Sequence, residues 1–289
     1  MASPLGRYYL YFAAHKGTSI RLAVADALKG PWRIHVPGSL QLKNSGFLTK
    51  PPELSEEQRS QVTAAYAARW IRVSHDVFYE ATTPHIASPD VHVDDARQRI
   101  RMYFHGLEDV ATQVTRVAES RNGIDFEVYP QVLGRSYIRV FEWNGFTYAI
   151  SMPGQFYCSK DGLSRFEHDS LLFNPNMRHA ALLVRKTTLY VFWTQVGDTP
   201  ERILLSTIDL CRNWGQWQES EPVEVLRPER DWEGADAPLE PSIRSTAYSQ
   251  VNQLRDPAIY SEDEHVFLLY AVAGESGIAI AEVFFDDTV

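Results

Sequence analysis

A four-strand pattern recurs along this chain, and it constrains the fold more than any other feature of the sequence. Residues 85–106 begin with an alternating run, pass through a polar turn and return as an aromatic-rich run, which is the pattern of a β-hairpin. Similar hairpins recur at 136–152, 178–197 and 255–274, and the first of these has an Asn-Gly turn. A third run follows each hairpin, and the polar segment after it predicts a turn into an outer strand, as at 213–220.

Units of four strands in a constant order predict an all-β chain folded as a five-bladed β-propeller, with antiparallel four-stranded blades. An antiparallel sandwich also has many short strands and is the alternative, but it does not explain why the Trp- and Tyr-rich second strands return so regularly. The third runs occur five times, at 19–26, 113–120, 154–162, 202–210 and 277–285.

Three stretches depart from the pattern. Residues 8–36 supply only three strands, so the first blade lacks its innermost strand; either the chain starts inside a longer family pattern, which we favour, or another segment fills the slot. Residues 53–71 have helical spacing of apolar side chains and predict one inserted helix at the binding face, with a solvated loop as the alternative. Residues 219–254 predict a long ordered loop.

Composition limits the function classes. The 289 residues, 44% hydrophobic and 12% aromatic, suit a single β domain over 1–289. A net charge of −9 disfavours nucleic acid as a partner. No apolar run reaches membrane-spanning length, and the first residues do not resemble a signal peptide, so we expect a cytoplasmic protein without a membrane partner. Cys158 and Cys211 are too few for a disulfide framework.

Propeller geometry selects a candidate site. The innermost strand of each blade starts at the face where the second strand ends, so residues at those positions converge at one mouth. We expect Ser88, Asp90 and His92 to share one face of their strand, as a period of two requires. We expect Asp90 and Asp256 to be the principal carboxylates at that mouth and Glu275 a possible acid. The remaining side chains at these positions predict a substrate-binding set of His15, Ser88, His105, Ser136, Arg139, Arg178, Gln195 and Arg255, and a possible metal-binding set of His85, His105 and His179.

Structural roles are open alternatives for several of these residues. Asp90 could belong to the polar face of a strand, and Asp256, which precedes a proline, could cap a turn. His15 and His105 could be ordinary loop-start residues. Arg139 and Arg178 need carboxylate or ligand partners if they lie near the axis, because an unpaired buried guanidinium is unfavourable.

The stretches YYLYFAAHKGTSIRLAVADALKGPW (8–32), SPDVHVDD (88–95), RHA (178–180) and LRDPAIY (254–260) carry a resemblance over nearly the whole chain. They resemble the blades of the five-bladed propeller glycoside hydrolases of families 32, 43, 62 and 68. The resemblance implies a carbohydrate pocket on the axis and three carboxylates: a base on blade one, an aspartate on blade two and a glutamic acid on blade three.

The chain departs from that pattern at each catalytic position. The blade-one strand that would carry the base is absent, Ser88 stands where the blade-two aspartate belongs, and Ser136 stands about where the acid belongs. His179 alone matches a family position, at which family 43 often has a histidine beside an axial ion. The family's catalytic residues therefore cannot be transferred, although its fold can.

The leading hypothesis is a glycoside hydrolase-like propeller that acts on a carbohydrate or another small polar ligand in an axial pocket. One alternative is a non-catalytic carbohydrate-binding or scaffold propeller. Another is a metal-dependent enzyme that uses the axial histidines to hold a divalent ion.

Overall fold

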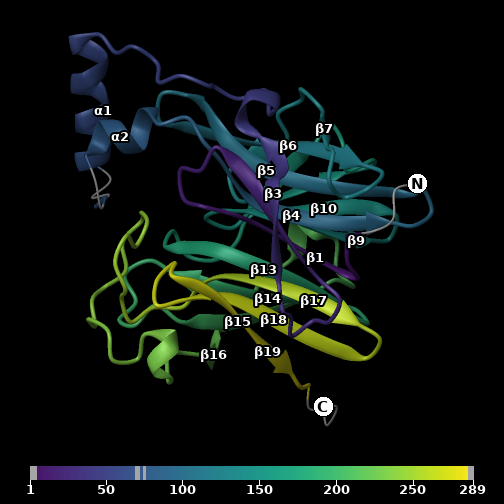
Figure 1. Ribbon diagram of the computed structural model, residues 1–289. Helices are drawn as coiled ribbons and strands as arrows, with labels where there is room; N and C mark the ends of the chain where they lie inside the picture. Colours follow the sequence, from purple (N-terminus) through teal and green to yellow (C-terminus); the bar gives the residue numbers. More distant parts are fainter. Residues whose placement is uncertain (1–4, 69–71, 74–75, 286–289) are drawn as a thin grey trace.

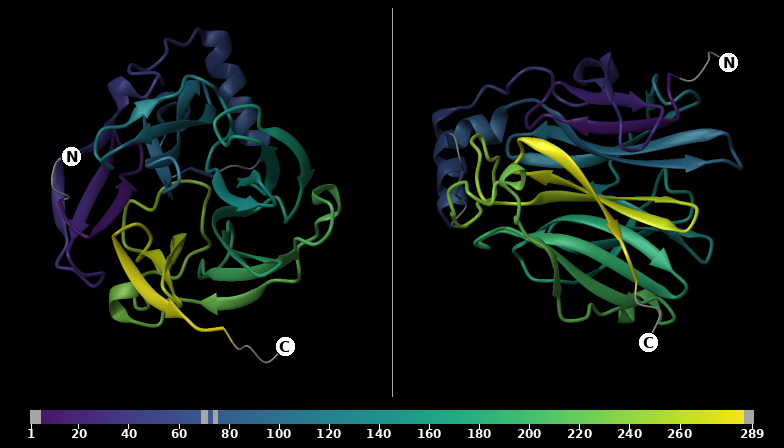
Figure 2. Two further views of the ribbon diagram at one scale, coloured as in Figure 1. Left: turned by 90° about the vertical axis from the view of Figure 1, so that its right-hand side faces the viewer. Right: turned by 60° about the horizontal axis from the view of Figure 1, so that its bottom comes forward.

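The chain folds into five antiparallel sheets set around a central axis in the order of the sequence (Figures 1 and 2). The structure is a computed structural model that describes residues 5–68, 72–73 and 76–285. The first and fifth sheets are neighbours, so the ring of blades closes between them. Within the described residues no helix is long and apolar enough to cross a membrane.

Each sheet is one blade, and its strands run from the axis outward in chain order. Blade one contains β1 (Tyr8–Ala13), β2 (Ser19–Ala25) and β3 (Arg33–Gln41). Blade two contains β4 (Ile86–Asp94), β5 (Arg99–Asp109), β6 (Thr112–Ser120) and β7 (Glu127–Val128), and β8 (Gly134–Arg135) also pairs with β6. Blade three contains β9 (Arg139–Trp143), β10 (Phe146–Ser151), β11 (Gln155–Ser159) and β12 (Glu167–Leu171). Blade four contains β13 (Met177–Arg185), β14 (Thr188–Gln195), β15 (Ile203–Asp209) and β16 (Val223–Leu226). Blade five contains β17 (Arg255–Glu262), β18 (His265–Val272) and β19 (Gly277–Val283).

The predicted five-bladed propeller is confirmed, including a first blade of three strands. The described part of blade five also has three strands, one fewer than the general pattern. The β9–β10 hairpin turns at Asn144 and Gly145, whose φ angles of 49° and 77° are both left-handed. This tight turn matches the twist of the two strands that it joins.

Alternation along the strands builds the interfaces between blades. On β5, Met102 and Phe104 belong to the apolar cluster that blade two shares with blade one, whereas Tyr103 belongs to the cluster shared with blade three. Two further apolar clusters join blades three and four and blades four and five. The apolar side chains on the two faces of a blade thus pack against the blades on either side, as a side-chain period of two requires.

Blades one and five meet through polar and aromatic contacts. The Tyr8 hydroxyl donates to Glu262 Oε2 at 2.8 Å, and Arg7 Nη2 lies 2.6 Å from Glu262 Oε1. The rings of Tyr8 and Tyr260 pack edge to face at 6.1 Å between centroids. These contacts join the two ends of the circle.

The inserted segment forms two helices, α1 (Glu56–Ala68) and α2 (Val77–Thr82). The predicted helix over 53–71 is confirmed for α1, while residues 69–71 lie outside the described residues. At its start, Ser55 and Gln58 exchange hydrogen bonds between side chain and backbone, so the capping box forms. Both helices lie on the face that also carries the connection from β16 to β17 (left side of Figure 1).

One prediction about blade four was wrong. We expected residues 213–220 to form its outer strand and 219–254 to be a loop, but the outer strand is β16, inside that loop. Residues 214–216 form a 3-10 helix instead. The alternation in β16 covers only four residues, too short to distinguish it from the polar sequence around it.

Candidate functional site

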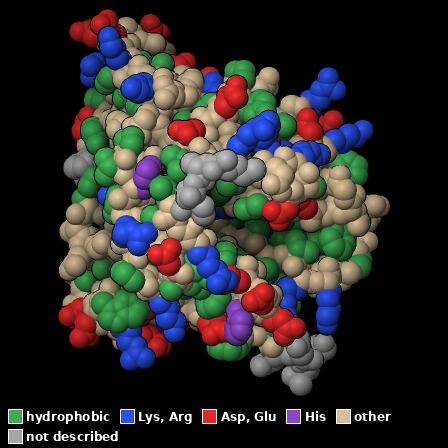
Figure 3. Space-filling view, turned by 45° about the vertical axis from the view of Figure 1, so that its right-hand side comes forward, with side chains coloured by type: hydrophobic (Ala, Val, Ile, Leu, Met, Phe, Trp, Pro, Cys, Tyr) green, Lys and Arg blue, Asp and Glu red, His purple; other side chains and the backbone are tan. Residues whose placement is uncertain are grey.

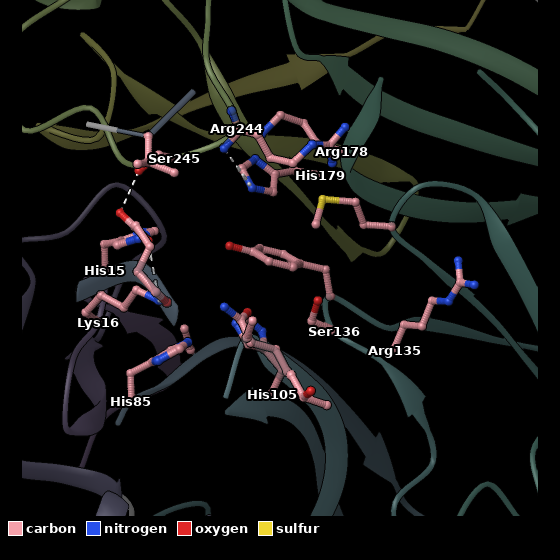
Figure 4. Close-up of a pocket in the computed structure, with 18 of the residues that line it drawn as sticks. His15, Lys16, His85, His105, Arg135, Ser136, Arg178, His179, Arg244 and Ser245 are labelled. Atoms are coloured by element: carbon pink, nitrogen blue, oxygen red, sulfur yellow. Dashed lines mark hydrogen bonds and ion pairs between the residues drawn. The ribbon is translucent and has the colours of Figure 1, made fainter. Parts of the chain in front are cut away.

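A cavity of about 670 Å³ opens where the innermost strands begin, on the face that carries α1 and α2. Figure 4 shows side chains from several blades turned toward it. The cavity is lined by His15, Lys16, Ala65, Tyr66, Val73, Glu80, His85, Ala87, His105, Ala111, Thr112, Gln113, Arg135, Ser136, Tyr137, Met152, Arg178, His179, Arg244 and Ser245.

Three histidines of blades one and two form one side of the cavity, which we call the histidine wall (His15, His85 and His105). Burial and the nearby charge of Lys16 lower the pKa of His15 to about 3 and that of His85 to about 4. Burial also lowers the pKa of His105 well below its usual value. The histidine wall is therefore uncharged at neutral pH.

A different side of the cavity carries Arg178 and Arg244, which we call the arginine wall (Figure 4). Arg178 is buried, and its Nη1 lies 3.5 Å from Glu201, a carboxylate with no exposed surface. Glu201 also lies 3.2 Å from Arg255 Nε, and Arg255 Nη1 lies 2.9 Å from Glu275. A chain of alternating charges thus runs behind this wall from blade four to blade five.

Tyr137 separates two of the histidines proposed as metal ligands. Its ring packs against His105 at 4.4 Å and against His179 at 4.9 Å between centroids. The structure therefore does not bring His85, His105 and His179 to a common point. Among the residues the structure describes, no three His, Cys, Asp or Glu side chains are arranged to hold a metal ion.

The carboxylates of Asp256 and Glu275 lie next to the cavity lining. His179 Nδ1 lies 2.8 Å from Asp256 Oδ1, and His15 Nδ1 lies 3.9 Å from Glu275 Oε2. Desolvation favours the neutral form of Asp256, but His179, Arg178 and Arg255 outweigh it and hold its pKa well below the ordinary value.

Glu275 is shifted in the opposite direction. Burial and the charge of Asp256 raise the pKa of Glu275 to about 7, in spite of the arginines beside it. Below about pH 7 the carboxyl groups of Asp256 and Glu275 are thus in different protonation states, the condition under which one can act as a base and the other as an acid.

Lys16 and Glu80 connect the histidine wall to the inserted helix α2. Lys16 Nζ donates to the Glu80 carbonyl at 2.9 Å and lies 3.5 Å from its carboxylate, and both side chains are buried. The Ser245 hydroxyl donates to Glu80 Oε1 at 2.7 Å. The pair therefore ties together a turn of blade one, the insertion and the β16–β17 connection.

Other predicted site residues lie away from the cavity lining. Asp90 accepts from the Val140 amide at 2.9 Å and contacts His92 at the same distance, so it joins blades two and three. We expected Ser88, Asp90 and His92 to share one face, but β4 has a bulge between Ala87 and Asp90, and Ser88 has a φ of 52°. The bulge breaks the alternation on which that expectation rested.

Some of the predicted site residues line the cavity, whereas Arg139, Gln195 and Arg255 do not. Arg139 donates to the Ser88 carbonyl at 3.2 Å, and Gln195 bonds with Asn174 and Asp198. Arg255 lies behind the arginine wall. The residues that do line the cavity are His15, His85, His105, Ser136, Arg178 and His179.

Sequence reasoning missed several residues of the site. Tyr137 directly follows Ser136, and its φ of 62° is rare for a bulky residue, so it enters the cavity through a backbone kink that spacing does not reveal. Arg244, Glu80 and Glu201 come from irregular segments or blade connections. A buried carboxylate such as Glu201 has no sequence signal apart from its partners.

The arrangement of the sheets is shared with solved structures. A thermostable family-43 glycoside hydrolase superimposes with a TM-score of 0.61 at 11% identity, covering 98% of this chain and 87% of its own. An endo-1,4-β-xylanase from Bacteroides thetaiotaomicron gives 0.62 at 13% identity over 97% and 87%. The α-L-arabinanase of Cellvibrio cellulosa, in complex with arabinohexaose, gives 0.55 at 11% identity over 96% and 89%. The chain thus has the fold of the five-bladed propeller glycoside hydrolases, as the resemblance predicted.

The sequence comparison adds a closer relative. The chain is 34% identical to uncharacterized protein R118 of Acanthamoeba polyphaga mimivirus, over 96% of this chain and 76% of that protein. The chain belongs to the same family as R118. No protein-family model matches the sequence.

Proposed function

We propose that this propeller is a glycosidase that binds a carbohydrate in the cavity and uses Asp256 as the ionised carboxylate and Glu275 as the proton donor. The observation that carries the proposal is this pair of carboxyl groups beside the cavity, held in opposite protonation states by their surroundings. The side chains of Asp256 and Glu275 are 38% and 20% exposed, and each lies beside a histidine that lines the cavity, His179 and His15 respectively.

Unpaired polar atoms around the cavity support a ligand rich in hydroxyl groups. His15 Nε2, His105 Nδ1 and Arg178 Nε are buried and have no hydrogen-bond partner among the described residues. A buried polar group without a partner is unfavourable, so each of these atoms favours a ligand that supplies one. The structural neighbours include an enzyme in complex with xylotriose and another with xylose.

The test is hydrolysis of a panel of aryl glycosides, with sugar binding measured separately by calorimetry. Asp256→Asn and Glu275→Gln should each lower the rate by about 100-fold or more while leaving binding measurable. Asp263→Asn and Glu264→Gln, in the exposed turn between β17 and β18, are matched controls and should behave as wild type. Full activity in both site variants would exclude this pair as the catalytic groups.

A non-catalytic carbohydrate-binding module is the second candidate, and one observation favours it. Both carboxylates already have partners, the imidazole of His179 for Asp256 and the guanidinium of Arg255 for Glu275, and among the described cavity-lining residues the only carboxylate, Glu80, is paired with Lys16. Sugar binding that depends on Asp256, together with no hydrolysis of any glycoside by the wild type, would identify the chain as such a module.

A further inference from the structure

The arginine wall contains a guanidinium without an anionic partner. Arg244 lines the cavity and donates to the Pro175 carbonyl at 2.9 Å. Within the described residues no carboxylate lies within 4.0 Å of it, although a guanidinium has five donors. Burial and the charge of Arg178 lower the pKa of Arg244, which means that its surroundings disfavour its own positive charge.

The neighbouring arginine is also incompletely paired. Arg178 Nε is a buried donor with no partner among the described residues, and the carboxylate of Glu201 lies 3.5 Å from Nη1 on the side away from solvent. Figure 4 shows Arg244 and Arg178 close together beside His179. Two cations from separate segments are thus held side by side at the cavity surface.

The charge of the cavity lining contrasts with that of the whole chain. The chain carries a net charge of −9, and acidic and basic side chains are interspersed over the face in Figure 3. Among the described residues, the cavity lining has four cationic side chains, Lys16, Arg135, Arg178 and Arg244, against the one carboxylate of Glu80, which is paired with Lys16. Arg135 is exposed and lies apart from the other two arginines.

From the pairing and position of Arg178 and Arg244 we infer that the sugar bound in this cavity carries an oxyanion, a carboxylate or a phosphate, which lies against these two guanidinium groups. A planar guanidinium matches the oxygens of either group, and charge-assisted hydrogen bonds of this kind are about twice as strong as neutral ones. The oxyanion would separate two repelling cations and satisfy the buried Nε. This inference rests on the proposal that the cavity binds a carbohydrate, and it specifies the class of that carbohydrate.

The experiment compares charged and neutral sugars on the full chain. Calorimetry measures the affinity for methyl glucuronide, methyl galacturonide and glucose 6-phosphate against methyl glucoside and methyl xyloside, with inorganic phosphate as a separate arm. We expect at least one charged sugar to bind about tenfold or more tightly than its neutral counterpart. That preference should weaken with added salt, because salt screens exposed charges. The carboxylate and phosphate arms distinguish the two sources of the oxyanion.

Substitutions of Arg244 test whether this residue causes the preference for a charged sugar. Arg244→Met should lower the affinity for the charged sugar about tenfold more than that for the neutral sugar, whereas Arg244→Lys should keep part of the preference. Arg121→Met, at an exposed turn, is the matched control and should change neither affinity. Near-ultraviolet circular dichroism of each variant checks that the fold is retained.

The outcomes for the two proposals differ. Equal affinity for charged and neutral sugars, an equal loss of both in Arg244→Met, or binding of inorganic phosphate without any charged sugar would overturn the oxyanion inference. Hydrolysis of neutral glycosides without a charge preference would overturn it while the proposed glycosidase stands. A charge preference without hydrolysis would keep the inference and overturn the glycosidase. Absence of any sugar binding would overturn both.

Discussion

The histidine wall and the arginine wall line the same cavity but are built from side chains of different chemistry. The histidine wall is uncharged, and within it the ring of His105 contacts those of His85 and Tyr137. In the arginine wall the pKa of Arg178 is raised, because Glu201 and the carboxylates of blade five offset the effect of its burial. The comparison shows that a nearby counter-charge can outweigh the effect of burial on the pKa of a side chain.

The difference extends to the response to pH. A histidine whose pKa is lowered by folding binds its proton more readily in the unfolded chain, so it destabilises the fold as pH falls below about 6.5. Glu275 has a raised pKa, so it stabilises the fold below its ordinary value of 4.5 and loses that contribution as pH rises toward about 7. The buried histidines and Glu275 therefore change the stability in opposite directions between pH 4.5 and about 6.5.

The largest expected effect comes from breaking the arginine wall. Arg178→Met leaves Glu201 fully buried with Arg255 as its remaining cation, and loss of one partner of a buried ion pair costs about 3–5 kcal/mol. Urea unfolding measures the change in the free energy of unfolding. Arg121→Met is the control and should change it by about 0.5 kcal/mol or less. A loss in Arg178→Met no larger than that of the control would mean that the network is not held by its charges.

The next effect isolates the histidine wall. His105→Phe removes a buried titrating group while keeping a ring beside Tyr137. Relative to the variant, the wild type should lose stability by up to about 1.4 kcal/mol per pH unit as pH falls below about 6.5. Urea unfolding of both chains at several pH values measures the difference. If the stability of the wild type and that of His105→Phe change in parallel with pH, folding does not lower the pKa of His105.

Glu275→Gln tests the opposite slope. As pH rises from 4.5 to about 7, the wild type should lose stability relative to this variant by up to about 1.4 kcal/mol per pH unit. The hydrolysis rate gives a second readout, because a proton donor with this pKa loses activity above pH 7. Glu264→Gln is the matched control. If stability depends on pH in the same way in Glu275→Gln as in Glu264→Gln, the pKa of Glu275 is not raised.

The smallest effect concerns the residue that separates the walls. Tyr137→Phe keeps the ring between His105 and His179 and removes only the hydroxyl, so we expect a change in stability of about 1 kcal/mol or less. Sugar affinity, measured by calorimetry, should fall more than stability does if the hydroxyl contacts the ligand. A loss of several kcal/mol in stability would instead show that the hydroxyl holds the two walls together.

The period of the strands was sufficient to predict the propeller and the face where the cavity lies. Hydrophobic alternation directly specifies which residues face a neighbouring blade, as Met102 and Tyr103 show. Alternation failed at the starts of the inner strands, where Ser88, Tyr137 and Asp256 have left-handed φ angles. These backbone kinks turn the side chains away from the faces that a period of two predicts.

The sequence by itself determined five blades, the inserted helix and the convergence of six predicted residues at one cavity, because strand periodicity and connection order are local properties that repeat. The tertiary structure alone decided which charges are paired. Glu201 meets Arg178 and Arg255 across two blades, while Arg244 meets no carboxylate among the described residues. Protonation depends on distance and burial, and these arise only when segments far apart in the chain are packed together.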